Sequence, residues 1–125
     1  MSMFRLGACI VAAACLTGCA SEVVRSPASF TPAAGASRAQ IEVAEEATVQ
    51  SSSGYTRVLP AGSLWELRGS IAQGMAYRRV NGIFTVEGAH VHEAFIVISS
   101  GRLVGFYLPV EQAYSPAVPV VLKLK

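Results

Sequence analysis

Apolar and polar residues alternate along much of the chain from residue 41 onward. The clearest cases are 64–71, where Trp65 and Ile71 fall on one face, and 119–125, where two leucines alternate with two lysines. A period of two is the pattern of a strand with one buried and one solvated face. The alternation therefore predicts β-strands rather than helices in this part of the chain.

Turn signals divide the alternating part into short segments. Pro60-Ala61-Gly62 is a strong turn sequence, and Asn81-Gly82 predicts a hairpin between 75–80 and 83–87 because both residues tolerate positive φ. We expect an all-β fold: a small antiparallel barrel or sandwich of about six to seven short strands, leaning towards the SH3 or OB kind. The segments from which these strands are drawn are 41–50, 55–59, 64–71, 75–80, 83–87, 94–98, 103–108 and 119–125.

The first of these segments allows two interpretations. Glu45 interrupts the alternation of 41–50, so it marks a bulge or an edge if the segment is a strand. The sequence Ala44-Glu45-Glu46-Ala47 favours a helix instead, because Ala and Glu are good helix formers.

The two most apolar segments, 94–98 and 103–108, flank a Ser-Ser-Gly-Arg turn and predict a hairpin. Both faces of these strands are apolar, so we expect them at the centre of the sheet and covered on both sides. Gly105 indicates a bend or close packing, with Trp65 as the candidate neighbour. Residues 110–116 are expected to form a loop or a single helical turn.

The beginning of the chain has a different pattern. Residues 6–16 form an apolar run of eleven residues after the positive charge of Arg5. As a helix this run would reach only ~16 Å, about half of the hydrocarbon core of a bilayer. A short apolar run after a basic start is typical of a signal peptide rather than of a spanning helix.

The next residues, Leu16-Thr17-Gly18-Cys19, resemble the lipobox of bacterial lipoproteins. The resemblance implies that 1–18 is a removed signal peptide and that Cys19 is acylated and becomes the new N-terminus. Ala20 is not the Asp that commonly retains such proteins at the inner membrane, so the resemblance implies sorting to the outer membrane. The domain would then face the periplasm, with the cell surface as the alternative.

Residues 19–40 are rich in Pro, Ala and Ser and have no apolar periodicity. Such a composition indicates a semi-flexible tether. We therefore divide the chain into a signal peptide (1–18), a lipidated tether (19–40) and one small β-domain (41–125). Phe30 is either an idle aromatic in the tether or a residue that docks on the domain or a partner.

Charge and cysteine content remove several classes of function. Residues 41–125 carry seven Lys and Arg and seven Glu, so no basic surface for nucleic acid is expected. Cys9 and Cys15 would leave with the signal peptide, and lipidation would consume Cys19. No thiol would remain for a disulfide, a metal or catalysis.

His90 and His92 are the two histidines of the chain, and on a strand they would project from the same face. That spacing occurs in metal sites, and Glu87 is a candidate third ligand. The alternative is a solvent-facing pair that hydrogen-bonds to its neighbours. The chain contains no Asp and no evident activated nucleophile, so we expect no enzyme and no cofactor.

Two groups of aromatic residues are candidate binding sites. Trp65 and Tyr77, together with His92, would line a ligand site at the mouth of a barrel, unless Trp65 is the main core aromatic. A second group would form an exposed apolar patch for a protein partner, unless a loop covers it. The members of that group are Phe106, Tyr107, Val110 and Tyr114.

The leading functional hypothesis is a non-enzymatic lipoprotein whose β-domain binds another protein of the cell envelope, as an accessory subunit of an envelope or secretion assembly. The alternative is a periplasmic binder of a small molecule or polymer, including a hydrolase inhibitor. A metal-dependent enzyme at the two histidines is the third hypothesis.

Overall fold

The structure is a computed structural model that describes residues 21–34 and 39–125. The expected signal peptide 1–18 and the lipidated Cys19 lie outside the described residues. The described residues contain no helix with the length and hydrophobicity that a membrane crossing requires.

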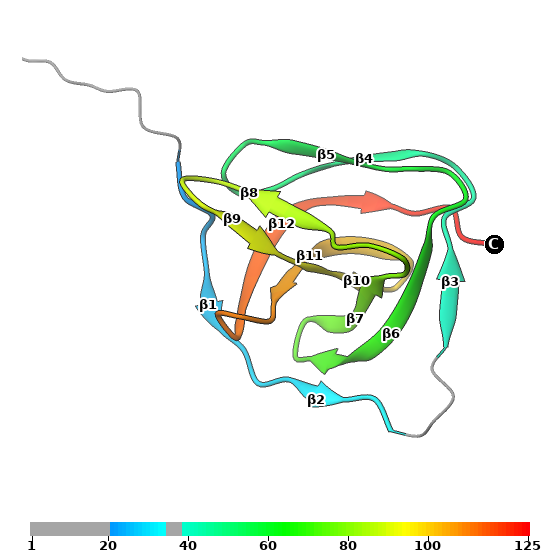
Figure 1. Ribbon diagram of the computed structural model, residues 1–125, viewed down its shortest axis with the longest axis horizontal. Helices are drawn as coiled ribbons and strands as arrows, with labels where there is room; N and C mark the ends of the chain where they lie inside the picture. Colours follow the sequence, from blue (N-terminus) through cyan, green and yellow to red (C-terminus); the bar gives the residue numbers. More distant parts are fainter. Residues whose placement is uncertain (1–20, 35–38) are drawn as a thin grey trace, which may run out of the picture.

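The expected all-β fold is confirmed. The main element is an antiparallel eight-stranded sheet that curls into a half-barrel (Figure 1). Its order is β1 (Ser26–Pro27), β12 (Ala113–Val121), β11 (Arg102–Leu108), β10 (Phe95–Ser99), β7 (Gly74–Arg79), β6 (Leu64–Ile71) and β2 (Thr31–Pro32), and β3 (Gln40–Glu42) also pairs with β6.

Two small antiparallel sheets complete the domain. One pairs β4 (Ala47–Gln50) with β5 (Thr56–Leu59), and the other pairs β8 (Thr85–Glu87) with β9 (Val91–Glu93). Residues of both small sheets pack against the large sheet around Trp65 and Phe106. We call this cluster the inner core. Its members include Val43, Val49, Leu59, Trp65, Phe84, Val86, Ile96, Leu103, Phe106 and Leu108.

The central hairpin formed by β10 and β11 is confirmed, with Phe95 paired to Tyr107 and Ile96 paired to Phe106. Successive side chains of a strand point to opposite faces, so the hairpin contributes to two cores. Phe106 lies in the inner core, whereas Tyr107 lies in a second, outer core. The outer core consists of Ile71, Ala76, Phe95, Val97 and Tyr107.

The N-terminal strap, which we define as residues 21–34, covers the outer core and corrects the predicted domain boundary. Its strand β1 pairs with β12, and its strand β2 pairs with β6 at the other side of the sheet. Between them, the ring of Phe30 stacks on Tyr107 at 4.7 Å between centroids. The tether predicted over 19–40 is therefore part of the domain over residues 21–34.

The sequence did not reveal the strap because it buries few side chains. Val23 is buried and Ala28 and Phe30 are partly buried, and these three residues do not form a periodic pattern. Pro27 and Pro32 indicated a linker, yet both lie in two-residue strands at the edges of the sheet, where a missing N–H is tolerated. Of the alternatives for Phe30, docking on the domain is the one observed.

Two other predictions of local structure were wrong. Segment 41–50 is two strands, since β3 ends at Glu42 and β4 begins at Ala47 in a different sheet. Asn81 has the positive φ expected of a turn, 62°, but the flanking strands do not pair, since β7 lies between β6 and β10. The number of strands is therefore larger than expected.

The end of the described chain also differs from the prediction. The strand predicted at 119–125 begins earlier, at Ala113, because Tyr114 pairs with Tyr107 of β11, and it ends at Val121. The loop predicted over 110–116 is consequently shorter. Leu122 is buried as expected, whereas Leu124 is exposed and makes only an isolated bridge to Val43.

Gly105 is closely packed as expected, but Tyr114 rather than Trp65 lies against it. A Cβ atom at Gly105 would lie 2.5 Å from the backbone oxygen of Ser115 and 2.6 Å from the Tyr114 ring. The Tyr114 hydroxyl donates a hydrogen bond to the Val104 carbonyl at 2.9 Å.

Gly105→Ala is expected to lower the free energy of unfolding by about 1–3 kcal/mol, because a side chain there forces β11 and β12 apart. Gly82→Ala is the matched control, since a Cβ at Gly82 would meet no atom within 4 Å. Urea denaturation of the two variants measures the difference. Equal stability of the two variants would contradict the close packing at Gly105.

Candidate functional site

His92 lies on β9 and is only 5% exposed. His90 precedes β9 and is largely exposed, so the two rings do not share the solvent-facing position expected for the pair. Their centroids are 6.4 Å apart. Strand β9 thus places one histidine inside the domain and the other at its surface.

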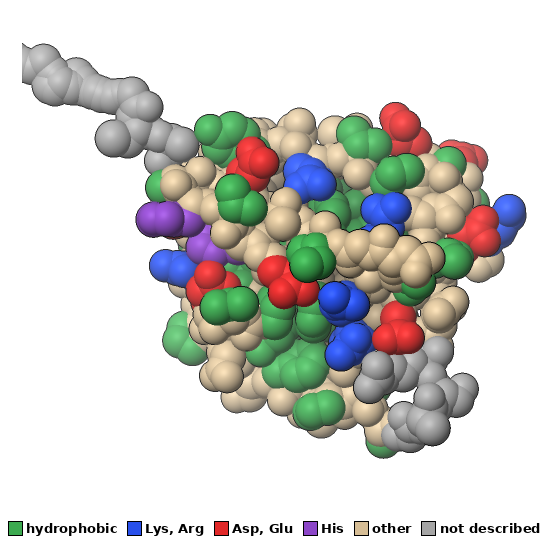
Figure 2. Space-filling model, viewed as in Figure 1, with side chains coloured by type: hydrophobic (Ala, Val, Ile, Leu, Met, Phe, Trp, Pro, Cys, Tyr) green, Lys and Arg blue, Asp and Glu red, His purple; other side chains and the backbone are tan. Residues whose placement is uncertain are grey.

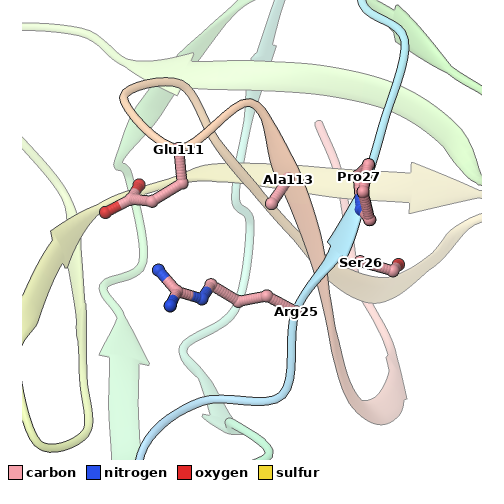
Figure 3. A pocket seen from close by; sticks show the side chains of 5 residues that line it. All are labelled: Arg25, Ser26, Pro27, Glu111 and Ala113. Carbon is pink, nitrogen blue, oxygen red and sulfur yellow. The ribbon is translucent and has the colours of Figure 1, made fainter.

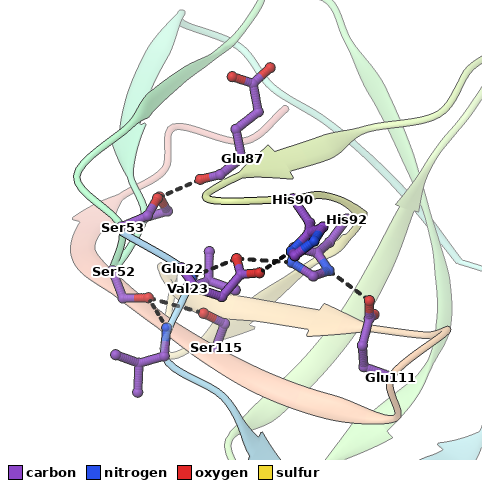
Figure 4. Close-up of polar contacts among 11 residues, drawn as sticks. Glu22, Val23, Ser52, Ser53, Glu87, His90, His92, Glu111 and Ser115 are labelled. Carbon is purple, nitrogen blue, oxygen red and sulfur yellow. Dashed lines mark hydrogen bonds and ion pairs between the residues drawn. The ribbon is translucent and has the colours of Figure 1, made fainter. Parts of the chain in front are cut away.

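Two carboxylates hold the buried histidine (Figure 4). Glu111 Oε2 lies 2.6 Å from Nδ1 of His92, and Glu22 Oε1 lies 3.1 Å from Nε2. The other oxygen of Glu22 lies 2.8 Å from Nδ1 of His90. We call these four residues, Glu22, His90, His92 and Glu111, the carboxylate–histidine cluster.

The contacts within the cluster favour the charged forms of Glu22 and His92. The hydrogen bond from His90 and the backbone N–H of Val23 lower the pKa of Glu22 to about 2. Burial alone would lower the pKa of His92, but hydrogen bonds to Glu111 and Glu22 outweigh it and raise this pKa above its ordinary value. A protonated His92 donates from both ring nitrogens, one to each carboxylate. The cluster therefore joins the strap, β9 and the loop before β12.

The structure does not bring together the ligand set considered from the sequence, His90, His92 and Glu87. Among residues 21–34 and 39–125, no group of three or more His, Cys, Asp or Glu side chains is arranged to hold a metal ion. Both nitrogens of His92 face carboxylates. Glu87 does not reach the histidines, and its backbone carbonyl accepts a hydrogen bond from the Ser53 hydroxyl instead.

Glycines allow the strap to reach the cluster and the sheet. A Cβ atom at Gly88 would lie 2.5 Å from Glu22 Oε1 and 2.9 Å from the Val23 nitrogen. At the other end of the strap, a Cβ atom at Gly69 would clash with the Thr31 carbonyl and lie 2.5 Å from the Phe30 ring. Two residues without side chains therefore stand where the strap approaches the domain most closely.

The structure does not bring the predicted ligand-binding residues to a barrel mouth. Trp65 is fully buried, lies edge-on to Phe84 at 5.3 Å, and donates a hydrogen bond from Nε1 to the Ser63 hydroxyl at 3.0 Å. Tyr77 is partly buried against the inner core. Trp65 is thus a core aromatic, the alternative that the sequence left open.

The predicted partner patch is likewise divided among different environments. Phe106 is in the inner core, Tyr107 is covered by Phe30, and Tyr114 is half-buried over Gly105. Only Val110 is open to solvent, at 78% exposure. The four residues therefore do not form one exposed patch: the strap covers Tyr107, and Phe106 faces the inner core.

A shallow depression of about 400 Å³ lies beside the cluster (Figure 3). The strap forms one wall with Arg25, Ser26 and Pro27, and Glu111 and Ala113 form the other. Oε1 of Glu111 is buried without a hydrogen-bond partner. The depression therefore combines a guanidinium with one oxygen of a carboxylate whose other oxygen is held by His92.

The sequence analysis identified the histidines but neither carboxylate partner. Glu22 lies 70 positions from His92, and Glu111 lies 19 positions from it. Glu22 is the only acidic residue in 19–40, and this isolation was the one available signal. Comparisons with protein families, characterised proteins and solved structures found no match to this chain.

Proposed function

We propose that the chain is a lipoprotein acylated at Cys19 and held at the outer membrane, with its β-domain in the periplasm. We propose further that the domain is not an enzyme but binds another protein of the cell envelope. The lipobox Leu16-Thr17-Gly18-Cys19 supports the anchoring. The balance of charge over 41–125 supports a protein rather than a nucleic acid as the partner.

The proposal that the domain binds a protein rests on the exposed side chains in the second half of β12. Val118 and Val121 are 58% and 59% exposed there. In the described chain, β1 pairs with Ala113 and Tyr114 of β12, and the segment that contains β4 runs beside the rest of the strand, with a bridge from Ser51 to Ala117 and a hydrogen bond from the Ala44 N–H to the Lys123 carbonyl. The exposed valine side chains themselves are suited to a protein partner.

A photoreactive amino acid at Val118 or Val121, introduced in living cells, tests this proposal. We expect one discrete adduct with an envelope protein. Ile83 is the matched control, because it is an exposed aliphatic residue outside β12. Absence of an adduct at both valines, with the protein folded and abundant, would contradict protein binding at this edge, as would equal labelling from Ile83.

The anchoring is tested separately with Cys19→Ser. We expect this variant to lose the attached lipid and to leave the membrane fraction, because the thioether needs the Cys19 sulfur. Intact mass and membrane fractionation provide the measurements. A variant that stays in the outer-membrane fraction would contradict anchoring through Cys19.

A second candidate is the binding of a small periplasmic ligand, and the depression between Arg25 and Glu111 is the observation that favours it. The Arg25 guanidinium suits a ligand that carries a carboxylate, such as an amino acid or short peptide. We expect such ligands to raise the melting temperature of the wild type but not of Arg25→Gln. No shift in the wild type would remove this candidate.

A further inference from the structure

The strap shortens the connection between the proposed anchor and the domain. Only Ala20 and Ser21 separate Cys19 from Glu22, and three residues of extended chain reach at most ~11 Å. A free tether over 19–40 would reach ~70 Å. Since Val23 is buried, the folded domain begins almost at the lipidated residue.

Several contacts fix this first part of the strap to the domain. Glu22 bonds to both histidines, and the Val24 backbone N–H donates to the Ser52 hydroxyl at 2.8 Å. Gly88 packs directly against Ser21, Glu22 and Val23. The connection is therefore short. Its domain end is held at three places: His92 on β9, the turn between β8 and β9 at Gly88, and the loop at Ser52.

The surface around this attachment has exposed apolar side chains. Val24 is 60% exposed and Val91, which follows His90, is 65% exposed. Figure 2 shows the two histidines together at one edge of the domain. The neighbouring charged groups, Glu22, Arg25 and Glu87, have no excess of positive charge. Anionic lipid would therefore not attract this face strongly.

We propose that this face, Glu22–Val24 and Gly88–Val91, lies on the bilayer, with Val24 and Val91 in the headgroup layer. The proposal rests on the proposed acylation of Cys19. The polar layer on each side of the hydrocarbon core is about 5–8 Å thick, which is comparable with the reach from Cys19 to Glu22. The docked strap thus fixes which face of the domain meets the lipid and which face is directed away from it.

Depth-dependent fluorescence quenching tests the orientation. The full chain is produced in bacteria, and the mature lipoprotein is placed in phosphatidylethanolamine–phosphatidylglycerol vesicles that contain brominated phospholipid. Val24→Cys and Val91→Cys provide single labelling sites, because Cys9 and Cys15 leave with the signal peptide and the lipid occupies Cys19. Val121→Cys is the control, because its exposure is similar and β12 ends on the opposite side of the domain from β1 (Figure 1).

We expect several-fold stronger quenching at Val24 and Val91 than at Val121. Equal quenching at the three positions would overturn the proposal. Intact mass identifies a failure of acylation separately, as a mature chain without lipid. A flexible insertion of Gly and Ser between Ala20 and Ser21 should abolish the difference in quenching between Val24 or Val91 and Val121, while the lipid remains attached. If the difference persists in this variant, the short connection is not what holds this face on the bilayer.

Discussion

Phe30→Ala is expected to lower the free energy of unfolding by about 2–3 kcal/mol. Truncation of a fully buried Phe costs about 3–5 kcal/mol, and Phe30 is only half-buried. The substitution removes the ring that stacks on Tyr107 and lies edge-on to Phe95 at 6.4 Å. Urea denaturation measures the loss, and trypsin should cleave after Arg25 faster than in the wild type, because the strap is held less firmly.

Thr31→Ala is the matched control for this prediction. Its side chain is exposed, and its backbone still pairs with Ser70, so we expect a change within about 0.5 kcal/mol. If Phe30→Ala and Thr31→Ala are equally stable and equally resistant to trypsin, the strap does not contribute to the outer core in solution.

His92→Leu is expected to destabilise the domain by about 2–3 kcal/mol at pH 6. The substitution keeps an apolar volume but leaves Glu111 without its hydrogen-bond donor. Removal of one member of a buried ion pair costs about 3–5 kcal/mol, and the partial exposure of both carboxylates reduces this value. His90→Gln is the control and should change little, because His90 is largely exposed.

The same cluster predicts how stability depends on pH. The pKa of His92 is raised in the folded state, so its contribution is complete below its ordinary value of 6.5 and is lost as the pH rises through the folded pKa. The pKa of Glu22 is lowered from 4.5 to about 2, so its contribution is complete above pH 4.5 and is lost as the pH falls towards 2. Maximum stability is therefore expected between about pH 4.5 and 6.5.

Thermal unfolding from pH 4 to 9 measures this dependence. Wild type should lose stability as the pH rises above 6.5 and through the raised pKa of His92, and His92→Leu should lose much less over the same range. A wild-type profile that rises steadily to pH 9 would contradict a protonated His92 held between Glu22 and Glu111.

The sequence predicted those parts of the fold in which neighbouring residues carry the signal. The hairpin of β10 and β11 was predicted because two apolar runs flank a short turn, and both strands are buried on both faces as expected. Trp65 was recognised as a candidate core residue from its place in an alternating strand. The turn at Asn81 was also recognised, but its strands pair with other partners, since Phe84 packs on Trp65 in the inner core.

The strap and the carboxylate–histidine cluster depend on contacts between distant residues. At strand spacing Phe30 has only the small Ala28 and the proline Pro32, which give no strand signal. The face that it covers, Phe95 and Tyr107, becomes visible only when β10 and β11 are paired. Glu22 likewise gains its role from the fold, because Gly88 leaves room for it beside His92. For the same reason, Tyr107 was assigned to a partner patch when it is in fact covered by the chain itself.

The pairing of β1 with β12 has a consequence for the order in which the domain folds. Ser26 pairs with Tyr114, so a residue near the beginning of the described chain can form its strand only after a residue near the end is in place. Contacts of such long sequence separation form slowly, since the intervening chain must first be closed into a loop. Phe95 and Tyr107 would stay uncovered by the strap until residues near Tyr114 have paired with β11. During that interval the folding domain exposes an aromatic surface, and a chaperone that binds such surfaces would have its greatest effect then.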